Sequence, residues 1–213
     1  MEDGFVRFVN EHSRKFVAPF PDVSSGSHRA FVNEAAFRLF EQHGMGCDEV
    51  TNEQVLAAFL EASAFVGRLI GSPLTPSTMT YFEGMAIREL ARRLVHFFYR
   101  TGQYGRVWLR PRFQGCGILS ACDGDVLADT TLFEVKAGLR EFRVPDFRQL
   151  ITYCSLNMEA NRYQIENIGV INPRLGTYYI LSLKEFALSV AGVNVNELSA
   201  RVLDFLSAQG TSR

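Results

Sequence analysis

The chain has 213 residues, of which 47% are hydrophobic, so it is long enough to bury one sizeable core. Its formal net charge of −1 excludes the strongly basic type of domain that binds nucleic acid tightly on its own. No apolar run is long enough to span a bilayer and the first residues lack a signal-peptide pattern, so we expect a cytoplasmic protein with no membrane partner.

The N-terminal half is predicted to be helical. Apolar spacing and Gly/Pro breakers indicate four helices, over about 2–18, 27–43, 51–70 and 77–101. Thr51 is the predicted cap of the third helix, and Gly102 follows the fourth. This half is rich in phenylalanine, which favours a surface for a protein partner.

The C-terminal half alternates between short β-rich runs and helical patterns. The strands are predicted at about 106–113, 117–127, 131–135, 165–172 and 177–182, and the helices at 145–157 and 195–208. This order predicts an α/β (α+β) fold, in which a mixed central sheet is flanked by helices.

A hairpin at residues 125–135 carries acids where a plain hairpin does not favour them. If Asp129 and Thr130 form the loop, Asp125 lies opposite Glu134, and two facing carboxylates repel each other unless a cation lies between them. A hard divalent cation such as Mg²⁺ suits them, because it takes oxygen ligands and retains waters. Lys136 lies two residues after Glu134 and therefore on the same face.

A second polar pattern follows on the helix predicted at 145–157. Gln149 and Tyr153 are four residues apart, so they lie one turn apart on a single stripe of that helix. Pro145 suits the first turn.

The spacing Asp-x8-Glu-x-Lys on a hairpin, followed by Gln-x-x-x-Tyr on a helix, resembles the PD-(D/E)xK nuclease superfamily and its RecB-like branch. The similar region covers about residues 105–183. The resemblance implies that Asp125, Glu134 and the carbonyl of Val135 bind Mg²⁺, with Mn²⁺ as a substitute. It also implies that Lys136 positions or activates the attacking water, and that Gln149 and Tyr153 bind the nucleic acid.

The resemblance further implies a restriction-endonuclease-like domain and a metal-dependent deoxyribonuclease. On this basis we divide the chain into a helical N-terminal extension (1–75), a nuclease core (76–190) and a C-terminal helix (191–213). We expect DNA as substrate and a helicase, ATPase or other subunit as protein partner, in DNA repair, recombination or phage defence.

Four cysteines are present, with no Cys-x-x-Cys pair and no zinc spacing. Some RecB-like nucleases carry an iron–sulfur cluster on closely spaced C-terminal cysteines, whereas this chain has no cysteine after Cys154. We therefore predict reduced thiols and no iron–sulfur cluster.

Several other side chains are candidates for the site. In many members of the superfamily a helix before the sheet adds one more metal ligand, for which Glu83, Glu89 and His96 are the candidates here. The hairpin register also makes Asp123 a candidate partner of Lys136. Seven arginines between residues 88 and 112 either follow a phosphate backbone or pair with acids elsewhere.

Two alternatives remain beside the nuclease. The near-neutral charge and the phenylalanine-rich N-terminal half also suit a noncatalytic or partner-activated, nucleic-acid-binding subunit of a larger complex. In the other alternative the hairpin has no catalytic role and the protein is a plain α+β scaffold.

Overall fold

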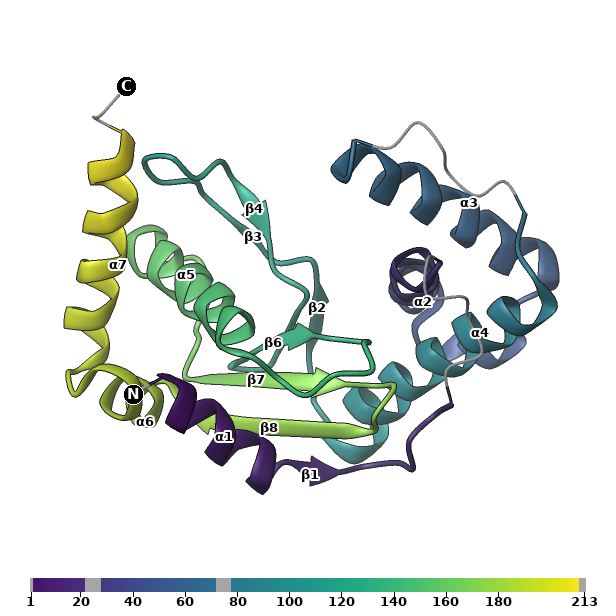
Figure 1. Cartoon of the computed structure of the whole chain (residues 1–213), viewed down its shortest axis with the longest axis horizontal. Coiled ribbons are helices and arrows are strands. Elements are labelled where there is room, and N and C mark those ends of the chain that lie inside the picture. The colour runs from purple at the N-terminus through teal and green to yellow at the C-terminus, as the bar shows by residue number, and fades with distance from the viewer. Residues whose placement is uncertain (1, 22–27, 72–77, 211–213) are drawn as a thin grey trace.

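The structure is a computed structural model that describes residues 2–21, 28–71 and 78–210. Within these ranges the protein is mixed α/β, with seven α-helices flanking a six-stranded mixed sheet (Figure 1). The six strands lie in the order β1-β8-β7-β6-β5-β2. Their bounds are β1 Arg14–Lys15, β2 Val107–Leu109, β5 Val126–Ala128, β6 Thr131–Val135, β7 Asn167–Asn172 and β8 Thr177–Ser182.

One pair of neighbouring strands in this sheet, β6 and β7, is parallel, and the other pairs are antiparallel. Parallel neighbours need a long crossover, which α5 (Val144–Ala160) supplies. A separate ribbon of two short strands, β3 (Arg112–Phe113) and β4 (Cys122–Asp123), lies beside α5 in Figure 1.

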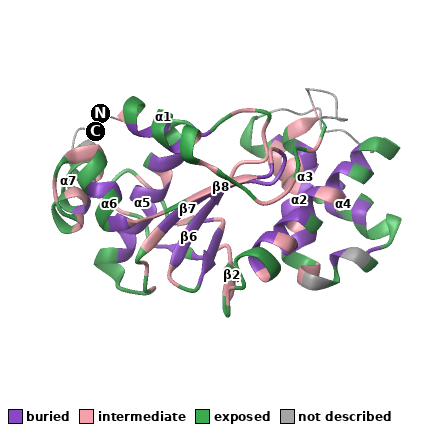
Figure 2. Cartoon of the chain, turned by 90° about the horizontal axis from the view of Figure 1, so that it is seen from below, coloured by how far each residue is buried: buried purple, intermediate pink, exposed green. Residues whose placement is uncertain are grey.

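Residues of the central strands alternate between two cores, as the period of two of a strand requires. Leu127, Leu132 and Ile168 face the core that contains α5, whereas Val126, Phe133 and Ile171 face the core of the N-terminal helices. Figure 2 shows the buried residues of β6 and β7 between these two groups of helices. The core that contains α5 also includes α1 Glu2–His12, α6 Leu183–Ala191 and α7 Val195–Gly210. The core on the other face of the sheet is formed by α2 Arg29–His43, α3 Asn52–Leu69 and α4 Tyr81–Val95.

Aromatic rings join the N-terminal helices to the sheet. Phe133 of β6 makes edge-to-face contacts with Phe97, Phe98 and Tyr104, with ring centroids 5.3 to 5.7 Å apart. Phe98 in turn stacks on Phe40 of α2. The phenylalanine-rich half of the chain therefore uses much of its aromatic surface inside the protein.

Several predicted elements are confirmed. Thr51 caps α3 and forms a reciprocal capping box with Gln54. Helix α4 continues as a π-helix over His96–Thr101 and stops at Gly102. The ranges of α2, α5, β7, β8 and α7 agree closely with the predictions, and the predicted starts at 27 and 77 lie outside the described residues.

Other predicted elements are wrong in extent. The helix predicted over 2–18 ends at His12, because the chain turns to pair Arg14 with Tyr178 at the sheet edge. The strands predicted over 106–113 and 117–127 are each broken. The first strand breaks at Arg110, which has a φ of +50°. The next residue, Pro111, has no N–H and cannot donate a hydrogen bond to a neighbouring strand. Helix α6 was not predicted, although the Ser182 capping box marks its start.

Candidate active site

The hairpin of β5 and β6 has the predicted register. Val126 pairs with Phe133, and Ala128 pairs with Thr131 across the Asp129-Thr130 turn. Asp129 adopts φ +49°, and its carboxylate accepts hydrogen bonds from the backbone N–H groups of Gly105 and Arg106. Asp129 therefore shapes the turn and takes no part in the acidic site.

Asp125 lies at the open end of this hairpin, one residue before β5. Its side chain is half-buried, and Oδ2 accepts a hydrogen bond of 2.7 Å from the backbone N–H of Val135. Burial raises the pKa of Asp125, against the opposing effects of this hydrogen bond and of Lys136. The carboxylate thus replaces a ladder hydrogen bond at the point where β5 begins.

Glu134 is the second acid and is 2% exposed. Its Oε1 accepts a hydrogen bond of 2.5 Å from Lys136 Nζ, whereas Oε2 is buried without a hydrogen-bond partner. Burial, followed by the charge of Asp125, raises the pKa of Glu134 to about 8. Glu134 is thus a buried acid that lies beside a second carboxylate and has one oxygen without a hydrogen-bond partner.

Lys136 connects this acidic pair to α5. Its Nζ lies 3.3 Å from Gln149 Oε1, and Gln149 Nε2 donates a 2.8 Å hydrogen bond to the hydroxyl of Tyr153. The structure therefore brings the hairpin residues Asp125, Glu134 and Lys136 together with Gln149 and Tyr153 of α5. Helix α5 begins beside this site. In its first turn Asp146 accepts hydrogen bonds from the backbone N–H of Arg143 and from both terminal nitrogens of the Arg140 guanidinium.

The oxygen atoms of this site suit a hard divalent cation as ligands. Asp125 and Glu134 supply carboxylates, the orphaned Oε2 of Glu134 is a free oxygen ligand, and Mg²⁺ is commonly bound by one or two carboxylates with waters in its other positions. Among the described residues no group of three or more His, Cys, Asp or Glu side chains gathers to hold a metal. A cation here would therefore rely on the two acids, the carbonyl of Val135 and water.

A cleft of about 330 Å³ opens beside the acids, between the hairpin end and the helices α2 and α3. One wall carries the cationic groups of Arg110, Lys136 and Arg140 next to Asp125. The facing wall is largely apolar and includes Phe37, Phe65 and Leu69. Asp125 and Lys136 therefore border this cleft, whereas the buried Glu134 lies behind its lining.

The other predicted ligands lie elsewhere. Glu83 bonds to Thr80 and His28, Glu89 pairs with Arg92 and Arg93, and His96 hydrogen-bonds to Thr101. Asp123 lies 3.6 Å from Arg112, its neighbour across the β3–β4 ribbon, whereas Lys136 donates to Glu134 and Gln149. These residues are held by local capping and pairing, which the spacing alone did not reveal.

Most of the predicted arginine stripe is committed to protein partners. Arg88 bonds to the carbonyl of Val50 and to Asn52, and Arg106 lies over the ring of Trp108. Arg110 is the member that reaches the cleft, where it pairs with Glu34 and Glu41 of α2. The stripe is thus mainly structural.

Sequence reasoning missed the residues that hold the segment after Lys136. Asn172 donates to the carbonyls of Gly138 and Arg140, and the fully buried Arg174 donates to the carbonyl of Ala137 and to Asn33 of α2. Both lie at the end of β7, parallel to β6. Polar residues at the carboxyl ends of adjacent parallel strands were the available signal.

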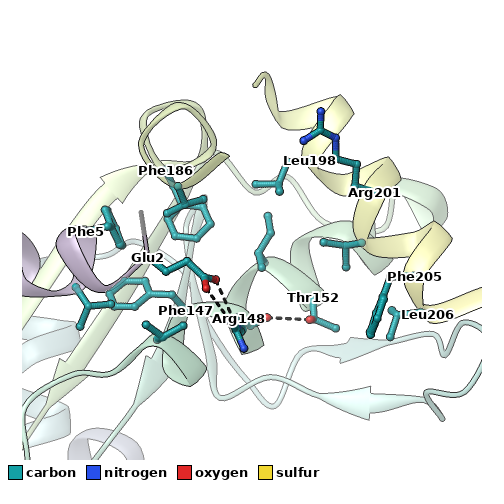
Figure 3. Close-up of a pocket in the computed structure, with 15 residues that line it drawn as sticks. Glu2, Phe5, Phe147, Arg148, Thr152, Phe186, Leu198, Arg201, Phe205 and Leu206 are labelled. Atoms are coloured by element: carbon teal, nitrogen blue, oxygen red, sulfur yellow. Dashed lines mark hydrogen bonds and ion pairs between the residues drawn. The ribbon is translucent and has the colours of Figure 1, made fainter. Parts of the chain in front are cut away.

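A second cavity, of about 420 Å³, lies between α1, α5, α6 and α7 (Figure 3). Its lining is mostly apolar and includes Phe5, Phe147 and Phe186, and the Glu2–Arg148 ion pair lies at it. The charged groups at this cavity are already paired, Glu2 with Arg148 and Arg201 with Glu197.

Comparison with protein-family models, with curated proteins and with solved structures gives no match to this chain. No helix in the described ranges is both long enough and apolar enough to cross a membrane.

Proposed function

We propose that the chain is a Mg²⁺-dependent DNA nuclease with a restriction-endonuclease-like core of the RecB-like type. The observation that carries the proposal is a pair of neighbouring acids, the buried Glu134 and the half-buried Asp125, which share one face of a hairpin with Lys136 while one glutamate oxygen has no hydrogen-bond partner. Such a pair costs folding free energy, and a function that needs a cation explains why the protein retains it.

The residues divide the work as follows. A cation held by Asp125 and Glu134 would supply Lewis-acid activation of the scissile phosphate and of the attacking water. Glu134, whose pKa is raised to about 8 by burial and by Asp125, would release its proton to solvent in order to hold a cation. Lys136 donates a hydrogen bond to the water or to the phosphate oxygen on which negative charge builds.

The cleft supports a phosphate-containing substrate. Its cationic wall, with Lys136 beside the acids, suits a DNA backbone, and its apolar wall limits water near the reacting groups. Because Arg110 and Arg140 are already paired with acids, the grip on DNA is weak. This agrees with a net charge of −1 and with a partner in a repair, recombination or defence complex.

The cleavage assay that tests the proposal uses linear and plasmid DNA with Mg²⁺, with Mn²⁺ and with EDTA. We expect phosphodiester hydrolysis with either metal and none in EDTA. Calorimetric titration of Mg²⁺ into the wild type and into Glu134→Gln should show binding in the first only. Equal binding by both proteins, or cleavage in EDTA, would show that the acids are not the metal site.

A partner-activated subunit is the second candidate function. The feature that favours it is a set of exposed apolar side chains at the end of α3 and the start of α4. Leu69, Ile70, Tyr81 and Phe82 are 59 to 77% exposed. Size-exclusion chromatography combined with the same assay separates the two functions. A stable monomer that cleaves DNA alone supports the autonomous nuclease, whereas metal binding without cleavage supports a subunit that needs its partner.

A further inference from the structure

We propose that Gln149 and Tyr153 are positioning residues for Lys136 and do not contact the nucleic acid directly. This inference rests on the proposed nuclease function, because it concerns how the lysine of that site is held. It assigns the Gln-x-x-x-Tyr pattern a different role from the one that the family resemblance implies.

Tyr153 is buried and cannot offer its ring to a base. It is 7% exposed, and it stacks on Phe113 of β3 with ring centroids 5.1 Å apart and an interplanar angle of 7°. The ring of Phe113 lies close to the backbone of Gly124, because this residue carries no side chain. A Cβ at residue 124 would lie 3.1 Å from the phenylalanine ring. The tyrosine is therefore fixed by packing before any ligand binds.

The fixed hydroxyl determines how Gln149 is oriented. Gln149 Nε2 donates to the Tyr153 oxygen at 2.8 Å, which leaves Oε1 facing Lys136 Nζ at 3.3 Å. A glutamine amide has a donor end and an acceptor end, so satisfying one end with a hydroxyl determines which way the other end points. Burial raises the pKa of Tyr153, so the hydroxyl keeps its proton.

This chain of contacts restrains a flexible side chain. A lysine ammonium has three donors on a four-carbon stem. Glu134 Oε1 and Gln149 Oε1 accept two of them and leave one for the reacting groups. Lys136 is thus held by one group from its own strand and by one from α5, so its position depends on the packing of that helix.

The first test compares Gln149→Ala, Gln149→Glu and Tyr153→Phe, with Gln103→Glu at an exposed site as the matched control. A glutamate at 149 still accepts from Lys136 and accepts from the Tyr153 hydroxyl, whereas it would repel a phosphate. We expect kcat to fall about 10- to 100-fold in Gln149→Ala, about 3- to 10-fold in Tyr153→Phe and least in Gln149→Glu, with KM within about 2-fold of the wild type.

A direct DNA contact predicts the opposite order. Gln149→Glu would then be the least active of the three variants. The effect would appear as a higher KM and a lower affinity for DNA. Either of these results would overturn the positioning role. Thermal unfolding of each variant verifies that the fold is kept.

The second test does not depend on activity. The chain has three lysines, and Lys15 and Lys184 are exposed, so they serve as internal references for acetylation of Lys136. Quantitative mass spectrometry of partly acetylated protein should show Lys136 reacting about 3-fold or more faster, relative to the references, in Gln149→Ala than in the wild type. An unchanged relative rate would overturn the positioning role.

The two tests separate the two proposals. If the wild type cleaves no DNA under any condition, the nuclease proposal fails, and the acetylation rates still decide whether Gln149 restrains Lys136. If the wild type cleaves DNA and the acetylation rates do not change, the nuclease proposal stands and the positioning role fails.

Discussion

Asp125→Asn, Glu134→Gln and Lys136→Ala are each expected to reduce Mg²⁺-dependent DNA cleavage by about 1000-fold while the protein stays folded. Removing a single group that stabilises the developing charge costs roughly 100- to 1000-fold in many enzymes. Here each group also touches another member of the site: Asp125 bonds to the backbone of Val135, and Lys136 bonds to Glu134. Initial rates on linear DNA, measured at saturating Mg²⁺, provide the comparison.

The variant that combines all three substitutions should cleave DNA about as fast as the least active single variant, because groups that act as a unit have strongly non-additive effects. Glu159→Gln near the other end of α5 and Lys184→Ala serve as controls, since both side chains are exposed, and both should cleave at the wild-type rate. Cleavage by the triple variant at more than about a tenth of the wild-type rate would remove these three residues from the mechanism.

Glu134→Gln is also expected to stabilise the metal-free protein by about 1–3 kcal/mol at pH 8. Glu134 has an ordinary pKa near 4.5, and burial followed by the charge of Asp125 raises its pKa in the folded protein to about 8. Below pH 4.5 the carboxyl is protonated in both states and contributes no difference. Between pH 4.5 and 8 the unfolded chain ionises more readily, so the folded state loses stability as pH rises.

Chemical denaturation in EDTA at pH 5 and pH 8 measures this effect. The advantage of Glu134→Gln should be small at pH 5 and full at pH 8, and Glu159→Gln should follow the wild type at both. Saturating Mg²⁺ should reverse the order, because only the wild type gains binding free energy. A glutamine variant that is less stable in EDTA at pH 8 would show that Glu134 is held by favourable contacts rather than by the need for a cation.

Local patterns predicted much of the fold and the essential geometry of the site. The Asp129-Thr130 turn fixed the hairpin register, and Asp125 and Glu134 occupy the next positions beyond its last pair, Val126 and Phe133. The four-residue spacing of Gln149 and Tyr153 correctly placed them on one stripe of α5. These features depend on neighbours in sequence, so periodicity and turn chemistry were sufficient to find them.

Features that depend on distant contacts escaped the sequence. The edge strand β1 exists because residues 14 and 15 meet β8, more than 160 residues later. The break at Arg110 accompanies its pairing with two glutamates of α2. The burial of Tyr153 depends on Phe113, which lies in a separate ribbon, whereas the prediction placed this residue in one continuous strand over 106–113. Tertiary packing overrode local preference at each of these places.

Anomalous scattering from crystals grown with Mn²⁺ in place of Mg²⁺ tests the central claim most directly. We expect one peak between Asp125 and Glu134, within about 2.0 to 2.3 Å of an oxygen of each carboxylate, and its loss in Glu134→Gln. Acids that point to opposite faces of the sheet, or a Mn²⁺ peak away from both of them, would contradict the account.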